Sequence, residues 1–239
     1  MGYFDTTTAF AIILLAAVIH ASFQLSVSVL TLLSGHALGR KSARHRLVRL
    51  IGGFILGAGM MAALLVSTLA FIFTTSLTGG IPRVLWAALC GAAVGVGITV
   101  WLFYYRGERG TGLWIPRGFA DFLSDRCKHS KSTAEAFGLG MTSVFAELLF
   151  VFIPLAITAL VLIGLPSEYQ VLGVFLYSAV SLLPLLVVGI LINNGHKLSH
   201  IQRWREANKR FLQFAAGSGL LVLGAYVYVE QVLRTTGGV

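Results

Sequence analysis

The sequence predicts an all-α membrane protein that crosses the bilayer six times, and three observations lead to this prediction. First, 56% of the 239 residues are hydrophobic and 11% are charged, whereas a soluble domain carries about 25% charged residues. Second, six apolar runs reach the about 20 residues that a helix needs to cross a bilayer. Third, the Lys and Arg residues gather in every second connection between those runs. Because the runs show no alternation of polar and apolar residues, a transmembrane barrel is excluded.

Each predicted span is an apolar run in which charged residues are absent or rare, and together the spans form a single transmembrane domain. In chain order they are residues 9–34, 51–75, 84–105, 136–163, 169–193 and 211–229. The longest connection, 106–135, divides the spans into two sets of three. It contains an amphipathic segment with Trp114, Phe119 and Phe122, which we expect to lie at the bilayer surface.

The basic residues predict the orientation, because the cytoplasmic loops of membrane proteins are enriched in Lys and Arg. Sixteen of the 18 Lys and Arg residues lie before span two, between spans three and four, or between spans five and six, and only Arg83 and Arg234 fall on the other side. We therefore expect a multi-pass protein of the plasma membrane with both termini outside the cytoplasm. The net charge of +9 is assigned to anionic lipid headgroups and not to nucleic acid, since the charges form short clusters beside apolar runs.

One acidic residue, Glu147, lies well inside the fourth span. A charge near the bilayer centre costs at least about 2.5–3.5 kcal/mol, so such a residue is a functional candidate by default. Ser143 precedes it by one helical turn. Pro154 follows on nearly the same stripe, where it removes a backbone donor and can kink the helix.

In the first span, His20 and Gln24 lie one helical turn apart on the same face. A buried His opposite a buried Glu can bind a proton or a cation. We therefore expect a site for a substrate or ion that is formed by His20, Gln24, Ser143, Glu147 and Pro154. The alternative is that these side chains only join helices through hydrogen bonds, with Glu147 protonated.

Two patterns of small residues bear on helix packing. Phe54-x-x-Gly57-x-Gly59 recurs 160 residues later as Phe214-x-x-Gly217-x-Gly219. Duplicated transporter folds leave such traces, and two similar hairpins with basic loops would also produce one. Glycines at helical spacing, such as Gly91 and Gly95, favour close approach between helices.

The order of these features resembles the superfamily that joins LysE-type exporters to the transmembrane domain of the DsbD and CcdA thiol-disulfide reductases. The similarity spans most of the chain and includes Phe54 to Gly59 in span two, Gly138-Leu139-Gly140 in span four and Gly217 to Gly224 in span six. It implies two inverted three-helix halves with both termini outside. The redox cysteines of the reductases are missing, because span one reads Ser22-Phe23-Gln24-Leu25-Ser26 and span four contains no cysteine.

The sequence therefore predicts a secondary transporter or exporter of a small solute or cation, coupled to protons through Glu147 and His20. The alternative is a membrane-embedded scaffold or accessory subunit that binds a partner membrane protein or a second copy of the chain. An enzyme is not expected, since there is one acid at membrane depth and no convincing Ser–His pair. No cofactor is expected, and the motif Cys127-Lys128-His129 has too few ligands to identify a metal.

Overall fold

The computed structural model describes residues 5–23, 25–38, 44–77, 79–103, 117–130 and 132–233 of the chain. The regular structure in these ranges is entirely helical, with no strand among them. Four helices are long and apolar enough to cross a membrane, and two bent helix pairs raise the number of candidate spans to as many as six. The prediction of an all-helical protein with several apolar helices, as a multi-pass membrane protein has, is confirmed.

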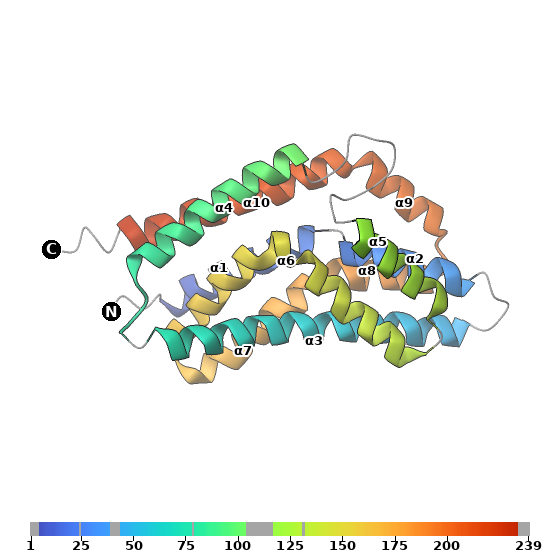
Figure 1. Ribbon diagram of the computed structural model, residues 1–239, viewed down its shortest axis with the longest axis horizontal. Coiled ribbons are helices and arrows are strands. Elements are labelled where there is room, and N and C mark those ends of the chain that lie inside the picture. Colours follow the sequence, from blue (N-terminus) through green and yellow to red (C-terminus); the bar gives the residue numbers. More distant parts are fainter. Residues whose placement is uncertain are drawn as a thin grey trace.

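Figure 1 shows the helices with the labels used below. In chain order they are α1 (Thr6–Ser22), α2 (Leu25–Leu38), α3 (Arg44–Ser76), α4 (Arg83–Phe103), α5 (Arg117–His129), α6 (Thr133–Gly164), α7 (Ser167–Ser181), α8 (Leu183–Asn193), α9 (Leu198–Ala207), α10 (Lys209–Tyr228) and the π-helix η1 (Val229–Leu233). The continuous helices α3, α4, α6 and α10 cover the second, third, fourth and sixth predicted runs.

The first predicted span is not one helix. α1 ends at Ser22, Phe23 is extended with a ψ of 142°, and α2 begins at Leu25. The two axes differ by 45°. The Ser22 hydroxyl donates to the Ile19 carbonyl at 2.6 Å, and the Phe23 ring stacks on Phe150 of α6 at 5.7 Å. The break therefore combines a hydroxyl that competes with the helical ladder with a tertiary contact, and no proline is involved.

The fifth predicted span is also broken, and a proline, Pro184, lies beside the break. α7 ends at Ser181, α8 begins at Leu183, and the angle between them is 46°. Pro184 lies in the first turn of α8. A proline is tolerated there because the first amides of a helix have no partner within the helix.

Two close helix pairs determine the shape of the bundle. In Figure 1 α3 runs along one side with α6 beside it, while α4 and α10 lie together along the opposite side. A Cβ on Gly57 of α3 would collide with the Phe137 carbonyl, and one on Gly97 of α4 would lie 3.0 Å from the Gly217 carbonyl of α10. Both pairs thus depend on glycine for their close approach. Gly91 and Gly95, which the sequence suggested as packing positions, have nothing within 4 Å of such a Cβ.

The helix predicted at the bilayer surface packs on the protein with part of its apolar face. Leu123 and Cys127 of α5 are buried, and the Cys127 thiol donates to the Val29 carbonyl of α2 at 3.8 Å. Phe122 is 45% exposed. The earlier part of this connection, with Trp114, lies outside the described residues. Among the described side chains of α5, Leu123 and Cys127 are therefore used in packing within the bundle, where α5 contacts α2 and α6, while Phe122 stays exposed.

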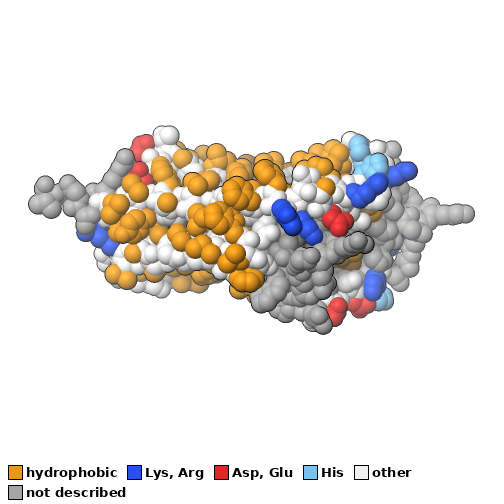
Figure 2. Space-filling view, turned by 90° about the horizontal axis from the view of Figure 1, so that it is seen from above, with side chains coloured by type: hydrophobic (Ala, Val, Ile, Leu, Met, Phe, Trp, Pro, Cys, Tyr) orange, Lys and Arg blue, Asp and Glu red, His pale blue; other side chains and the backbone are white. Residues whose placement is uncertain are grey.

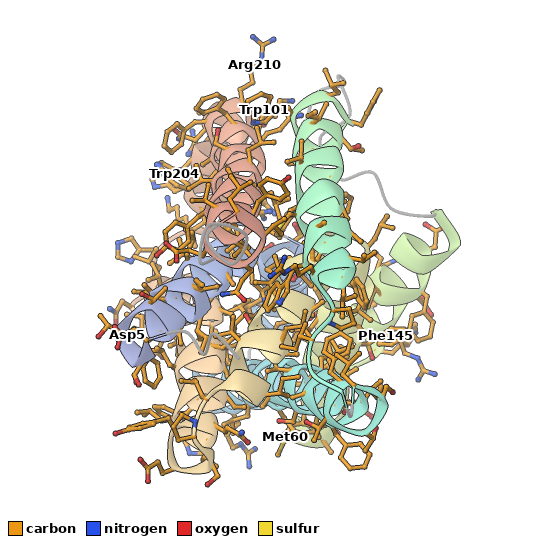
Figure 3. All side chains as sticks on the ribbon, turned by 90° about the vertical axis from the view of Figure 1, so that its left-hand side faces the viewer. Asp5, Met60, Trp101, Phe145, Trp204 and Arg210 are labelled. Carbon is orange, nitrogen blue, oxygen red and sulfur yellow. The ribbon has the colours of Figure 1, made fainter. Side chains whose placement is uncertain are left out.

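The surface divides into an apolar band and charged ends. Figure 2 shows hydrophobic side chains along much of the molecule, with most of the Lys, Arg and His side chains at the end that carries α5 and α9. We call this end the basic end. Figure 3, which looks along the bundle, shows Met60 and Phe145 at its periphery, and each is more than half exposed. Such a band fits the apolar core of a bilayer.

Candidate functional site

Three buried polar side chains from three helices meet inside the bundle. Nδ1 of His20 on α1 lies 2.9 Å from the hydroxyl of Tyr177 on α7. Nε2 of the same ring lies 3.7 Å from a carboxylate oxygen of Glu147 on α6. The exposed fractions are 5% for His20, 0% for Tyr177 and 3% for Glu147. The structure thus brings the predicted residues His20 and Glu147 together and adds Tyr177 to them.

A glycine on α7 allows this meeting. α1 packs on both α6 and α7. A Cβ on Gly173, one turn before Tyr177, would clash with Leu162 of α6 and lie 3.2 Å from Ile13 of α1. The missing side chain therefore lets three helices approach closely enough for their polar groups to touch.

A small cavity lies beside the pair, at the point where both broken helices break. Its volume is about 20 Å³, which is room for one water molecule. His20, Glu147 and Ser181 are its polar lining residues. Phe23 from the first break and Pro184 from the second also line it. The two interruptions of the helical ladder are therefore neighbours in space.

Two of the other predicted site residues, Ser143 and Pro154, are not brought to the cavity. Ser143 is buried, but its hydroxyl donates to the Gly140 carbonyl of its own helix at 2.8 Å. Pro154 is buried within α6, which continues through it to Gly164. Neither residue lines the cavity. Gln24 lies outside the described residues.

Sequence reasoning missed Tyr177, because aromatic residues within a span usually serve packing. A signal was nevertheless present. Gly173, Tyr177 and Ser181 follow one another at four-residue intervals and are the buried residues of α7. A stripe of small and polar residues on an otherwise apolar helix marks its protein-facing side.

The arrangement is suited to handling a proton. The distance of 3.7 Å between His20 and Glu147 is too long for a direct hydrogen bond but can be bridged by one water molecule. A buried carboxylate is costly unless it is paired or neutralised. Within the described ranges, no group of three or more His, Cys, Asp or Glu side chains is placed to hold a metal ion.

Comparisons with family models, with curated proteins and with solved structures found no match to this chain. The resemblance to the superfamily of LysE-type exporters and the DsbD and CcdA reductases therefore stays a prediction from sequence motifs.

Proposed function

We propose that the protein is a secondary transporter or exporter that moves a small solute or cation by alternating access, with Glu147 and His20 as its coupling site. One observation carries this proposal: two broken helices break beside the same buried acid–imidazole pair. Discontinuous helices near the membrane midplane are the usual place where secondary transporters bind substrate and coupling ions. An ionisable residue at that depth is itself a functional hypothesis.

The membrane arrangement that we propose counts each bent pair as one span. The six spans are then α1 with α2, α3, α4, α6, α7 with α8, and α10. With the basic end in the cytoplasm, both termini lie outside, as the distribution of Lys and Arg predicts. Anionic lipid headgroups would surround the basic end.

The helix contacts support two inverted halves. If the two halves are equivalent, span one corresponds to span four, span two to span five and span three to span six. Each contact between helices of one half or between the halves should then have a counterpart under this exchange. The contact of α1 with α7 then corresponds to that of α6 with α3, and the contact of α1 with α10 to that of α6 with α4. Inverted repeats produce such a pattern. The 160-residue echo relates span two to span six, so it is not a trace of this exchange.

The breaks provide the hinges that alternating access needs. A cavity of about 20 Å³ is too small for any organic solute, so the conformation described is a closed one. Opening requires movement of helix segments, and interruptions such as Phe23 and Leu182 can absorb the change in backbone angles. Each half-helix could then swing without unfolding its partner.

A cysteine-accessibility experiment tests the proposal without knowledge of the substrate. Ser181→Cys is introduced after Cys90→Ser and Cys127→Ser have removed the native thiols. A membrane-impermeant methanethiosulfonate reagent is then added to right-side-out or inside-out vesicles. We expect Ser181→Cys to react from both sides, because the cavity opens in turn to each. Reaction from neither side, or from one side only, would contradict alternating access and favour the scaffold alternative.

Thr158→Cys in the same background is the matched control. Thr158 is fully buried in α6 and does not line the cavity. We expect no reaction from either side, so that labelling of Ser181→Cys reports the cavity and not general loosening of the bundle.

A further inference from the structure

We propose that Tyr177 is a positioning residue that holds His20 as a neutral hydrogen-bond donor toward Glu147, and that the proton carried by the site binds to the Glu147 carboxylate. The transport role of this proton rests on the proposed function. The assignment of the protons rests on the hydrogen bonds of the buried cluster alone.

The Tyr177 hydroxyl determines which nitrogen of His20 carries a proton. It is completely buried, and Nδ1 of His20 at 2.9 Å is its hydrogen-bond partner among the described residues. A phenol has one proton to donate, and a buried donor without an acceptor is costly. If Nδ1 carried a proton and donated it to Tyr177, the O–H group would have no acceptor in the described part of the chain. The hydroxyl therefore donates to Nδ1.

A neutral imidazole carries one N–H, so an accepting Nδ1 places the proton on Nε2. Nε2 is the atom that faces Glu147 at 3.7 Å. The cavity lined by both residues has room for one water molecule, which can accept from Nε2 and donate to the carboxylate. His20 thus acts as a donor and has no free lone pair to take up a proton from Glu147.

The lining of the cavity favours a proton over a hard divalent cation as the coupled species. Around the cavity, α2, α3 and α8 contribute apolar side chains, such as Val27, Ala58 and Leu185. The Ser181 hydroxyl donates to the Ser178 carbonyl at 2.9 Å. Among the described lining residues, His20 and Glu147 are the titratable ones. Hard cations such as Ca²⁺ and Mg²⁺ take about six oxygen ligands, far more than these side chains offer.

The transport cycle adds one proton to Glu147 and later removes it. A proton from water on one side of the membrane forms an O–H bond with the Glu147 carboxylate, and the charge of the site changes from −1 to 0. His20 keeps its proton on Nε2, and Tyr177 keeps its phenolic proton. Release to water on the other side breaks the same O–H bond. Because enclosing an ion is costly, the protonated site favours the closed cavity and the ionised site favours opening to water.

Solid-state NMR in lipid bilayers tests the assignment. The protein is labelled with ¹⁵N-histidine and ¹³C-glutamate, and the signals of interest are identified by their loss in His20→Gln and Glu147→Gln. We expect an unprotonated Nδ1 and a protonated Nε2 throughout the pH range in which the Glu147 carboxyl signal titrates. An imidazolium in that range, or a protonated Nδ1, would overturn the proposal.

Two variants separate positioning from packing. Tyr177→Phe keeps the ring but removes the donor, so we expect both neutral tautomers of His20 to be populated. Tyr169→Phe makes the same change on the same helix, at a ring that packs edge-on against Phe10, and should leave the His20 spectrum unchanged. An unchanged tautomer in Tyr177→Phe would refute the positioning role.

Added cations distinguish a proton from a metal ion. At fixed pH, NaCl, KCl or MgCl₂ should leave the Glu147 and His20 signals in place. A shift with any of these salts would overturn the proton assignment. The NMR result is independent of the accessibility experiment. If two-sided labelling fails but the expected tautomer is found, the transporter is rejected and the proton site is kept. If two-sided labelling succeeds but another tautomer is found, the transporter is kept and the proton site is rejected.

Discussion

The α4–α10 pair and the junction around His20 both use glycine for close approach, but they differ in the continuity of their helices. Along the pair, Gly97 and Gly217 let two uninterrupted helices approach closely. The indole of Trp101 stacks on Phe214 at 5.6 Å and donates to its carbonyl at 3.1 Å. At the junction, two bent helix pairs are broken and a cavity remains beside a buried His–Glu pair.

The difference shows where this fold can move. Close-packed contacts resist deformation, because any shift opens voids or creates clashes. Broken helices with a cavity between them have fewer local contacts to lose, and moving elements are drawn from such regions of low local stability. The pair can therefore serve as a rigid support while the junction rearranges.

The largest effect on stability is expected from Gly217→Leu. The new side chain would meet the Trp101 ring and the Gly97 carbonyl. Overpacking costs typically about 1–3 kcal/mol of stability. We expect this variant at the upper end of that range, because one of the obstacles is a backbone carbonyl, which cannot move aside as a side chain can. The melting temperature of the protein in detergent should fall clearly. Gly91→Leu on α4 is the control, since a Cβ there meets nothing within 4 Å; equal losses in both variants would contradict the account of the pair.

A smaller loss of stability is expected from Arg205→Met, because Arg205 contacts α2, the second helix of the first bent pair. Arg205 of α9 is 3% exposed, and its guanidinium donates to the Ser28 hydroxyl of α2 at 2.8 Å. Hydrogen bonds to charged groups contribute about 1.5–3 kcal/mol, and Met keeps most of the side-chain volume. Arg203→Met is the control, because Arg203 is exposed and bonds within its own helix. If the two variants melt at the same temperature, the contact of α9 with α2 does not stabilise the first bent helix pair.

Glu147→Gln should change movement much more than stability. The amide keeps the shape of the carboxylate but cannot ionise, so the site should stay closed. We expect unfolding free energy within about 1 kcal/mol of wild type and a roughly tenfold or larger loss of two-sided labelling at Ser181→Cys. Glu168→Gln, at an exposed position of α7, should label normally. Normal labelling of the Glu147 variant would make this carboxyl a structural group.

The smallest expected effect is on the alkylation rate of Cys127, which lies at the basic end. Burial raises the pKa of its thiol from 9.0 to about 11, and the thiolate is the form that reacts. Alkylation by N-ethylmaleimide should therefore be slow at neutral pH, rise as the pH approaches about 11, and become fast when the protein is unfolded in dodecyl sulfate. Cys127→Ser measures the contribution of Cys90. Rapid alkylation of the folded protein at neutral pH would show that α5 does not pack stably on α2.

The candidate site was only partly predictable, and the reason differs between residues. Glu147 and His20 stand out because polarity inside an apolar run is a local property of the sequence. Tyr177 does not stand out, since its role depends on a partner 157 residues away. Ser143 was included for its place on the stripe of Glu147, yet its hydroxyl bonds to its own helix.

The sequence by itself determined that the chain is helical and apolar enough for a membrane, because the length and hydropathy of each run are sufficient to select helices in lipid. The break beside Pro184 also has a local cause in the sequence, because a proline lacks the backbone amide that continues a helix. Only the tertiary structure decided the break at Phe23, which has no proline and relies on the ring of Phe150. It likewise decided that both breaks lie at one cavity, because the contacts between helices depend on how whole surfaces fit together and not on any single run.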